Sequence, residues 1–412
     1  MKKVLYIALV AVLALILAGC CKNGQDKEKR MVLIYIAATE QSVSNYASGN
    51  ITDMLTGYVP KRKSETEALL VFLQKHGTDT PRSEATLTRY FSNNSGNIDS
   101  EIIANFGSDF DACDPDSFAR VLATAEAECK PTHRSLLFSS HGTGWMPEGY
   151  FDSDGEHYSK SQYSLKNTGS SRLDDLSKLR IRDGIGLDRP TGHELDIRDF
   201  ASVTGQYHWD VMLLDCCYLG AVEAAYELRN CCDYIAASPT EIMINGFPYN
   251  CILENLFKYP NAKGYKTICQ RYYDMYQAMT GSYQSGTISL VDCSQMDAFA
   301  SVCASITALQ RTQMESVDRM SVQHYFWKSD KDYFFDLADY FSRFATEEQM
   351  ESFSAQLDKT VIFKAATAEF IGLKINPDTF SGLSCYIPDP RYVNLNAYYK
   401  QLAWNQKVNI VQ

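Results

Sequence analysis

The chain has 412 residues, of which 45% are hydrophobic, 22% charged and 12% aromatic, and its formal net charge is −11. This composition is typical of a folded globular protein and excludes a disordered or collagen-like chain. The negative charge argues against a nucleic acid as partner, because binding to phosphates requires a basic surface. The length allows two domains, or one large domain with an appended piece.

The first twenty residues predict an export signal. Two lysines precede an apolar run, residues 4–18, and the sequence Leu-Ala-Gly-Cys that ends at Cys20 resembles a bacterial lipobox, in which the cysteine is acylated. The apolar run is short for a membrane-spanning helix, although an uncleaved membrane anchor is the alternative. We therefore expect a lipoprotein anchored to the cell envelope through Cys20, at the outer membrane or cell surface, with residues 21–30 as a charged, flexible tether.

The chain holds thirteen cysteines and seven histidines, which in an exported protein could signal disulfides or a metal site. The cysteines are scattered, mostly within apolar runs, with no Cys-x-x-Cys spacing, and the histidines form no His-x-x-x-His pair. We therefore expect no zinc cluster and no protein-held metal. Most of the cysteines are expected in the core, and disulfides stay an open alternative without a predicted connectivity.

Short apolar runs alternate with amphipathic stretches in the first part of the chain. The predicted strands are 31–39, 67–75, 85–91, 134–142, 210–217 and 233–238. The predicted helices are 116–129, with Asp116 as N-cap, and 220–230. Strands that alternate with helices predict an α/β fold, a mostly parallel sheet flanked by helices on both faces.

A long segment without apolar periodicity, residues 146–192, interrupts this pattern. An insertion of this length in a compact domain usually serves a function or is mobile. We predict one α/β domain, residues 31–258, that carries the insertion, and a C-terminal region, residues 259–412, that packs on it and extends the sheet. The elements predicted in the C-terminal region are the helices 264–280, 294–311, 333–357 and 397–406 and the strands 360–370 and 381–389.

Reactive residues follow two of the predicted strands. His141 and Gly142 lie at the carboxyl end of one strand, and Asp215, Cys216 and Cys217 at the carboxyl end of the next. Ligands of open α/β sheets bind outside these ends, so the histidine and a thiol would face each other if the strands are neighbours. An imidazole favours the thiolate that attack requires, and the N–H groups of Gly142 and Cys217 could form the oxyanion hole. Together they form a minimal apparatus for acyl transfer.

The order and spacing of these motifs resemble the clostripain family of cysteine peptidases. The resemblance rests on "SSHGTGW", on "DVMLLDCC" with the following "VEAAYELR", on "GFPY" and on "GLSCYIPD". It covers about residues 31–405 and implies a caspase-like fold and endopeptidase activity on proteins or peptides. It further implies that His141 is the catalytic histidine, that Cys217 is the nucleophile, and that Asp215 lines a pocket for a P1 Arg or Lys.

Strand alternation predicts different surroundings for the two neighbouring cysteines. Asp215 and Cys217 would share the face toward the crevice, and Cys216 would face the packed interior. The alternative for Asp215 is a structural role, as a buried carboxylate that fixes the loop.

The chain departs from the family pattern before the GFPY motif, where Ile242, Met243, Ile244 and Asn245 replace an acidic, glycine-rich approach. A strict preference for basic P1 residues is therefore left open. The resemblance also implies maturation by cleavage at a basic residue between the histidine and the nucleophile. The candidates in the insertion are Lys160, Lys166, Arg172, Lys178, Arg180 and Arg182.

Calcium is the one cofactor that the resemblance raises, since some family members depend on it. The acidic stretch 151–156 could bind calcium, although it lacks the spacing of a known calcium loop, and the chemistry itself requires no cofactor. We expect a monomer, or two associated chains after processing.

Two other functions are alternatives to a peptidase. A surface lipoprotein could keep the fold and use the crevice to bind a peptide or another ligand without catalysis, and the departure at residues 242–245 motivates this reading. A structural protein with all of its cysteines in disulfides would show few thiols on denaturation.

Overall fold

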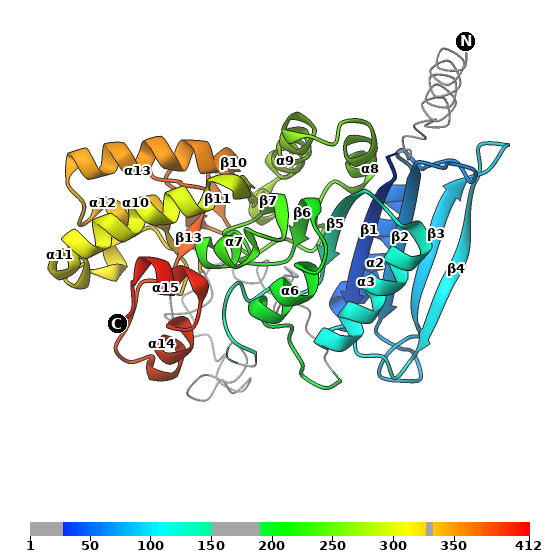
Figure 1. Ribbon diagram of the computed structural model, residues 1–412, viewed down its shortest axis with the longest axis horizontal. Helices are drawn as coiled ribbons and strands as arrows, with labels where there is room; N and C mark the ends of the chain where they lie inside the picture. Colours follow the sequence, from blue (N-terminus) through cyan, green and yellow to red (C-terminus); the bar gives the residue numbers. More distant parts are fainter. Residues whose placement is uncertain (1–27, 149, 151–189, 327–332) are drawn as a thin grey trace, which may run out of the picture.

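A computed structural model describes residues 28–148, 150, 190–326 and 333–412. Its centre is a nine-stranded sheet with the strand order β10-β8-β7-β6-β5-β1-β2-β3-β4 (Figure 1). The strands of this sheet are β1 (Arg30–Ala38), β2 (Glu67–Lys75), β3 (Ala85–Ser92), β4 (Ile98–Gly107), β5 (His133–Ser139), β6 (Trp209–Asp215), β7 (Cys232–Ala237), β8 (Thr287–Asp292) and β10 (Val361–Ala366). The predicted α/β fold class is confirmed.

The middle of the sheet is parallel, and both of its sides are antiparallel. β2, β1, β5, β6 and β7 run parallel to one another, whereas β3, β4, β8 and β10 are antiparallel to their neighbours. In β1, residues 31–38 are all at most 1% exposed, and such continuous apolar runs are typical of strands covered on both faces. The edge strand β4 is mostly exposed and rich in polar residues, so the sequence patterns do not predict it.

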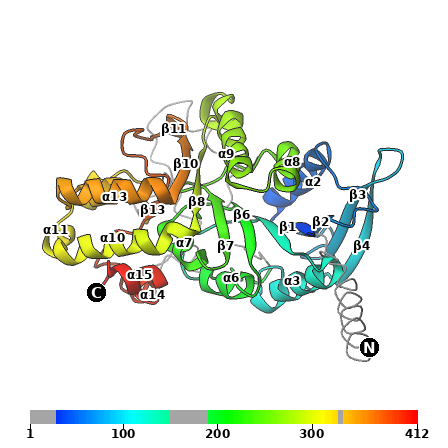
Figure 2. The same ribbon diagram turned by 45° about the horizontal axis from the view of Figure 1, so that its top comes forward.

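Helices cover both faces of the sheet (Figure 2). On one face lie α2 (Gln41–Leu55), α8 (Tyr249–Lys258) and α9 (Ala262–Gln277). On the other face lie α3 (Pro115–Cys129), α6 (Ile197–Thr204) and α7 (Val222–Leu228). The N-cap of α3 is Asp114 and not Asp116 as predicted, because the Asp114 side chain accepts the N–H of Ser117 at 2.8 Å and a proline fills the first helical position.

The C-terminal region continues the sheet with β8 and β10 and adds a group of helices beside it (Figure 1). The further helices are α10 (Met296–Leu309), α11 (Arg311–Glu315), α12 (Leu337–Ser342), α13 (Glu347–Thr360), α14 (Val393–Tyr399) and α15 (Ala403–Val408). Two small sheets pair β9 (Phe335–Asp336) with β13 (Ser384–Cys385) and β11 (Glu369–Phe370) with β12 (Leu373–Lys374). The division of the chain at residue 258 stays a prediction.

Four of the elements predicted in this region are wrong in extent. The strand predicted at 360–370 comprises β10 and β11, which belong to different sheets. The segment 333–357 is not one helix but β9, α12 and the start of α13, because Asp336 caps α12 and Thr346 forms a capping box at α13. Caps of this kind begin a new helix and separate it from the preceding segment. The segment 397–406 comprises parts of α14 and α15, and the strand predicted at 381–389 is only β13.

Candidate active site

β5 and β6 are neighbouring parallel strands that bring the two reactive motifs to one edge of the sheet. Ser139, the last residue of β5, pairs with Asp215, the last residue of β6. His141 and Cys217 each follow two residues later, in the turns beyond the strands and not within them as predicted. The site therefore lies outside the carboxyl ends of the parallel strands, where sheets of this kind bind ligands.

Gly142 lies directly against the backbone of Cys217. A Cβ atom at residue 142 would be 2.2 Å from both the N and the O atom of Cys217, so only glycine allows this approach. The contact brings the turn that carries His141 against the turn that carries the thiol. Both side chains are buried, with exposed fractions of 1% for His141 and 0% for Cys217. The structure therefore brings together the turns that carry His141 and Cys217, as predicted. The catalytic roles of these residues stay predictions.

The two neighbouring thiols contact different parts of the fold. Cys217 Sγ accepts the N–H of Ile242 at 3.1 Å, whereas Cys216 Sγ lies 3.6 Å from the carbonyl oxygen of Phe138 in β5. The two thiols have different surroundings, as predicted, but both are fully buried, so the crevice beside Cys217 stays a prediction. The cause of the difference is not the predicted one. Because β6 ends at Asp215, the turn and not strand alternation directs the two thiols apart.

The turn after β6 has a backbone conformation that few residues adopt. Tyr218 has a φ of 61°, which costs of order 1 kcal/mol for a residue with a Cβ. Its N–H donates to the carbonyl of Thr240 at 2.9 Å, and its ring stacks on Phe334 with centroids 4.3 Å apart. Gly144, with a φ of 66°, approaches the same phenylalanine ring so closely that a Cβ would collide with it. The C-terminal region therefore supports this turn directly, which the sequence patterns do not indicate.

Asp215 is fully buried and is held by two hydroxyl groups. Its Oδ2 accepts the hydroxyl of Ser139 at 3.0 Å and that of Tyr249 at 2.5 Å. Tyr249 is the last residue of the GFPY motif and the first of α8, so the motif is linked physically to the acid. Neither hydroxyl contact can be predicted from a sequence motif, because one depends on the register of β5 and β6 and the other on the packing of α8 against the sheet. These two hydrogen bonds agree with a structural role for Asp215. Its role in a substrate pocket stays a prediction.

The segment before the GFPY motif passes beside Cys217, and an acid that no sequence motif indicates directly precedes this segment. Residues 242–244 are buried and Asn245 is exposed, so the apolar departure from the family pattern serves core packing. Glu241, directly before this segment, is fully buried. This part of the fold thus contains two fully buried acids, Asp215 and Glu241.

A third acid contacts the imidazole itself. His141 Nε2 lies 2.5 Å from a carboxylate oxygen of Glu40, the residue directly before α2. No motif in the sequence indicates this contact, because it depends on β1 lying beside β5 in the sheet. In the sequence, the contact is indicated only by the position of Glu40, two residues after a buried strand.

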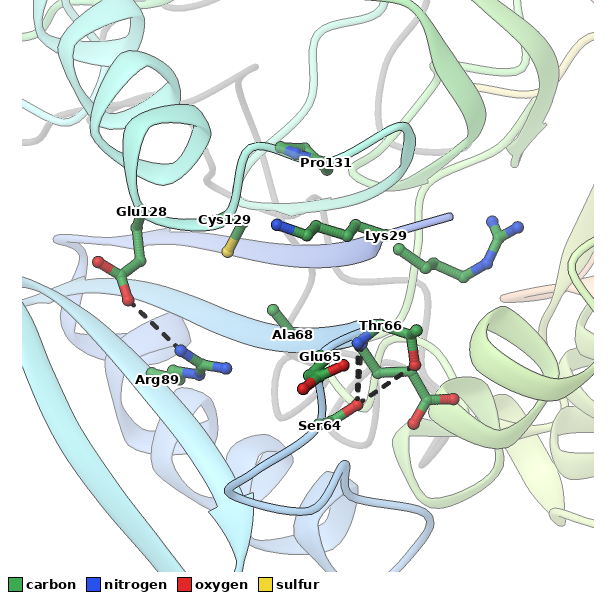
Figure 3. A pocket seen from close by; sticks show the side chains of 11 residues that line it. Lys29, Ser64, Glu65, Thr66, Ala68, Arg89, Glu128, Cys129 and Pro131 are labelled. Carbon is green, nitrogen blue, oxygen red and sulfur yellow. Dashed lines mark hydrogen bonds and ion pairs between the residues drawn. The ribbon is translucent and has the colours of Figure 1, made fainter. Parts of the chain in front are cut away.

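A cavity of about 440 Å³ opens at the opposite end of the parallel strands (Figure 3). The starts of β1 and β2 and the loop before β5 line it, together with Lys29, Arg89, Glu128 and Cys129. Burial raises the pKa of the Cys129 thiol to about 11, so this thiol is protonated at neutral pH. The cavity therefore lacks the activated thiol of a cysteine peptidase among its lining residues.

Several predicted features lie outside the described residues. These are the lipidation site Cys20, the acidic stretch 151–156 and the six basic residues from Lys160 to Arg182. In the part of the chain that the structure describes, no group of three or more His, Cys, Asp or Glu side chains could hold a metal ion. None of the helices described there is both long and apolar enough to cross a bilayer. No disulfide links the eleven cysteines of the described ranges, which contradicts the alternative in which all cysteines are bridged.

Comparison with known proteins gives one family and a set of similar folds. The model of the clostripain family matches residues 34–164 and 148–409. An inactive zymogen C11 protease from Parabacteroides distasonis is 27% identical, with a TM-score of 0.74 over 93% of this chain and 98% of that chain. A secreted C11 cysteine protease from Bacteroides thetaiotaomicron, solved with an irreversible peptide inhibitor, is 22% identical, with a TM-score of 0.72 over 93% of this chain and 99% of that chain. No curated protein matches the chain.

Proposed function

The chain belongs to the clostripain family and is a cysteine peptidase, and from this premise we propose that His141 and Cys217 form its catalytic dyad. The observation that carries the proposal is the contact between Gly142 and Cys217, because it holds the two turns together at the carboxyl ends of the strands. Family membership also favours catalysis over the alternative of a lipoprotein that only binds ligands.

The proposed reaction is acyl transfer through the thiol of Cys217. His141 takes the proton from Sγ, and the thiolate attacks the carbonyl carbon of the scissile peptide bond. The N–H of Ile242, 3.1 Å from Sγ, favours the thiolate, and the N–H groups of Gly142 and Cys217 hold the developing oxyanion. His141 then gives its proton to the leaving amine as the C–N bond breaks, and water hydrolyses the thioester and restores the thiol.

The intact chain is, in this proposal, a precursor. Both side chains of the dyad are buried in it, whereas a protein substrate must reach Sγ. Cleavage at one of the six basic residues between Lys160 and Arg182 would open the insertion and leave two associated chains. The similar structure from Parabacteroides distasonis is described as an inactive zymogen, which supports this reading.

A preference for Arg or Lys at P1 would come from Asp215. The acid lies two residues before the nucleophile, and the hydroxyls of Ser139 and Tyr249 hold its carboxylate in one orientation. A fixed, buried carboxylate attracts a cationic side chain more strongly than a mobile one at the surface, because water screens it less.

A lipid on Cys20 would anchor the exported protein to the cell envelope. β1 begins at Arg30, so the tether 21–30 would join the lipid to the amino end of the parallel strands. The dyad is at the carboxyl end of these strands and would face away from the membrane, toward substrates. The similar protease from Bacteroides thetaiotaomicron is described as secreted, which supports export.

Hydrolysis of fluorogenic Arg and Lys peptides by Cys217→Ala, with Cys216→Ala as the matched control, tests this function. We expect Cys217→Ala to lose hydrolysis completely, because the attacking sulfur is gone, and Cys216→Ala to stay within about threefold of the wild type. Mass spectrometry of the wild type after incubation with calcium or with EDTA would identify the maturation site and any calcium dependence.

The opposite pattern would overturn the assignment. If Cys217→Ala hydrolysed the peptides at the wild-type rate, or if only Cys216→Ala lost activity, the nucleophile would be a different residue. Thermal unfolding of both variants shows whether a loss of activity reflects a loss of folding.

A further inference from the structure

An acid just beyond β1 contacts the imidazole of the dyad. One carboxylate oxygen of Glu40 lies 2.5 Å from His141 Nε2, and the exposed fraction of the Glu40 side chain is 30% against 1% for His141. β1 and β5 are parallel neighbours with Ile36 opposite Ser139. Their carboxyl ends therefore lie side by side, and the chain just past each end supplies one member of the pair.

The helix that follows does not account for this glutamate. Glu40 is the N-cap residue of α2, yet its side chain makes no capping hydrogen bond. Ser, Thr, Asp and Asn cap helices well because their short side chains reach the first N–H groups of the helix. A glutamate at this position whose carboxylate meets a buried imidazole points to a role in the site and not in the helix.

We propose that Glu40 is a positioning residue that orients the His141 ring and stabilises the imidazolium formed during catalysis. The proposal rests on the dyad proposed above. A carboxylate beside Nε2 favours a proton on that nitrogen through its negative charge. Nδ1 then carries no proton and takes the proton from Cys217 Sγ. The imidazolium formed by this transfer is stabilised by the negative charge of Glu40. Nδ1 then passes the proton to the leaving amine, while the Nε2 proton stays in place.

Other ionisable groups near this edge have different contacts. His76, just past β2, lies with Nδ1 3.2 Å from the carbonyl oxygen of Thr39, and Asp215 is engaged by two hydroxyls. Glu241 and the nucleophile are further ionisable groups of this part of the fold. A change at Glu40 alters the charge beside the imidazole and leaves these other groups intact.

Glu40→Gln in the mature protein tests the proposal, because the amide keeps the shape of the side chain and removes its charge. We expect kcat on a fluorogenic peptide to fall about 10- to 100-fold with little change in KM. Glu40→Asp, which keeps the charge on a shorter side chain, should retain more of kcat than Glu40→Gln.

Asp233→Asn is the matched control. Asp233 pairs with His208 at 2.9 Å, and both side chains are more than half exposed, so this variant removes a carboxylate from a histidine far from the nucleophile turn. We expect it to leave kcat and KM unchanged.

Three outcomes would contradict a part of this account, and they are distinguishable. Wild-type kcat in Glu40→Gln, with Cys217→Ala inactive, would overturn the role of Glu40 and keep the dyad. Equal losses of kcat in Glu40→Gln and Glu40→Asp would show that the charge at residue 40 has no role in catalysis and would also overturn the proposal. Activity in Cys217→Ala would instead overturn the dyad itself.

Discussion

The two ends of the parallel strands carry different kinds of polar groups. At the carboxyl end, His141 and Asp215 are buried and make close contacts with an acid or with hydroxyl groups. At the amino end, Arg89 and Glu128 pair at 3.4 Å with side chains 24% and 33% exposed, beside the cavity of Figure 3. The candidate catalytic residues therefore lie at the end of the strands where polar groups are buried, and not at the cavity.

This difference shows that a concave surface alone does not identify the reactive end of a sheet. A surface ion pair contributes little to stability, because water and salt screen it. A buried polar group is costly unless it has a partner, so it persists where architecture or chemistry requires it. The carboxyl end is thus the end at which single substitutions should have large effects.

Gly142→Ala should give the largest effect on activity. The added Cβ would be 2.2 Å from two backbone atoms of Cys217, so the two turns must separate, and with them the imidazole, the thiol and the oxyanion donors. We expect kcat/KM for a P1 Arg peptide to fall about 1,000-fold and the free energy of unfolding to fall by about 2 kcal/mol. Peptide hydrolysis and urea unfolding measure the two quantities.

Gly49→Ala is the control for this substitution. Gly49 lies inside α2, and a Cβ there meets nothing within 4 Å, so the variant should keep full activity and gain up to about 1 kcal/mol of stability. Comparable activity of both alanine variants would show that the turns can separate without loss, and the close approach at residue 142 would have no catalytic role.

Asp215→Asn should give the next largest effect, on specificity. The amide oxygen can still accept the hydroxyls of Ser139 and Tyr249, but the negative charge is gone. We expect the ratio of kcat/KM for P1 Arg over a neutral P1 residue of similar length to fall about 100-fold. Ser139→Ala, which removes one hydroxyl and keeps the charge, should change this ratio by only about threefold. An unchanged ratio in Asp215→Asn would assign the acid to the structural role.

The parallel strands, β3 and β10 could be predicted from the sequence, whereas β4 and β8 could not. Buried parallel strands such as β1 are continuous apolar runs, which the pattern identifies directly. β4 is mostly exposed, so its sequence lacks the apolar run or alternation that identifies a buried strand. The sequence pattern predicts one helix at 333–357 where Asp336 and Thr346 in fact cap two separate helices.

The candidate site was predictable only for residues that sit in a local motif. His141, Gly142 and Cys217 stand in short motifs at strand ends, so strand position and the resemblance to the clostripain family together suggest their roles, which stay predictions. Glu40 and Phe334 reach the site through the neighbourhood of β1 and β5 and through the packing of the C-terminal region. Strand order and long-range packing are not readable from one sequence, so contacts of this kind require the structure.

Glu223→Gln should give a smaller effect, on stability alone, and tests the contrast between buried and exposed carboxylates. Glu223 in α7 accepts the N–H of Tyr386 at 2.9 Å and the hydroxyl of Tyr399 at 2.6 Å, and burial raises its pKa above the ordinary 4.5 to about 7. Folding therefore favours the protonated acid. Its contribution to stability is full below about pH 4.5 and is lost as the pH rises through 7. The variant should be more stable than the wild type by up to about 3 kcal/mol at pH 8 and by less than about 1 kcal/mol at pH 5.

Glu128→Gln, at the amino end, is the matched control for this prediction and should give the smallest effect. The Glu128 side chain is 33% exposed, so its replacement should change the free energy of unfolding by less than about 0.5 kcal/mol at either pH. Urea unfolding of both variants at pH 5 and pH 8 measures the difference. If Glu223→Gln were less stable than the wild type at pH 8, the buried carboxylate would stabilise the fold as an ion. The two ends of the sheet would then differ in geometry and not in the cost of burying charge.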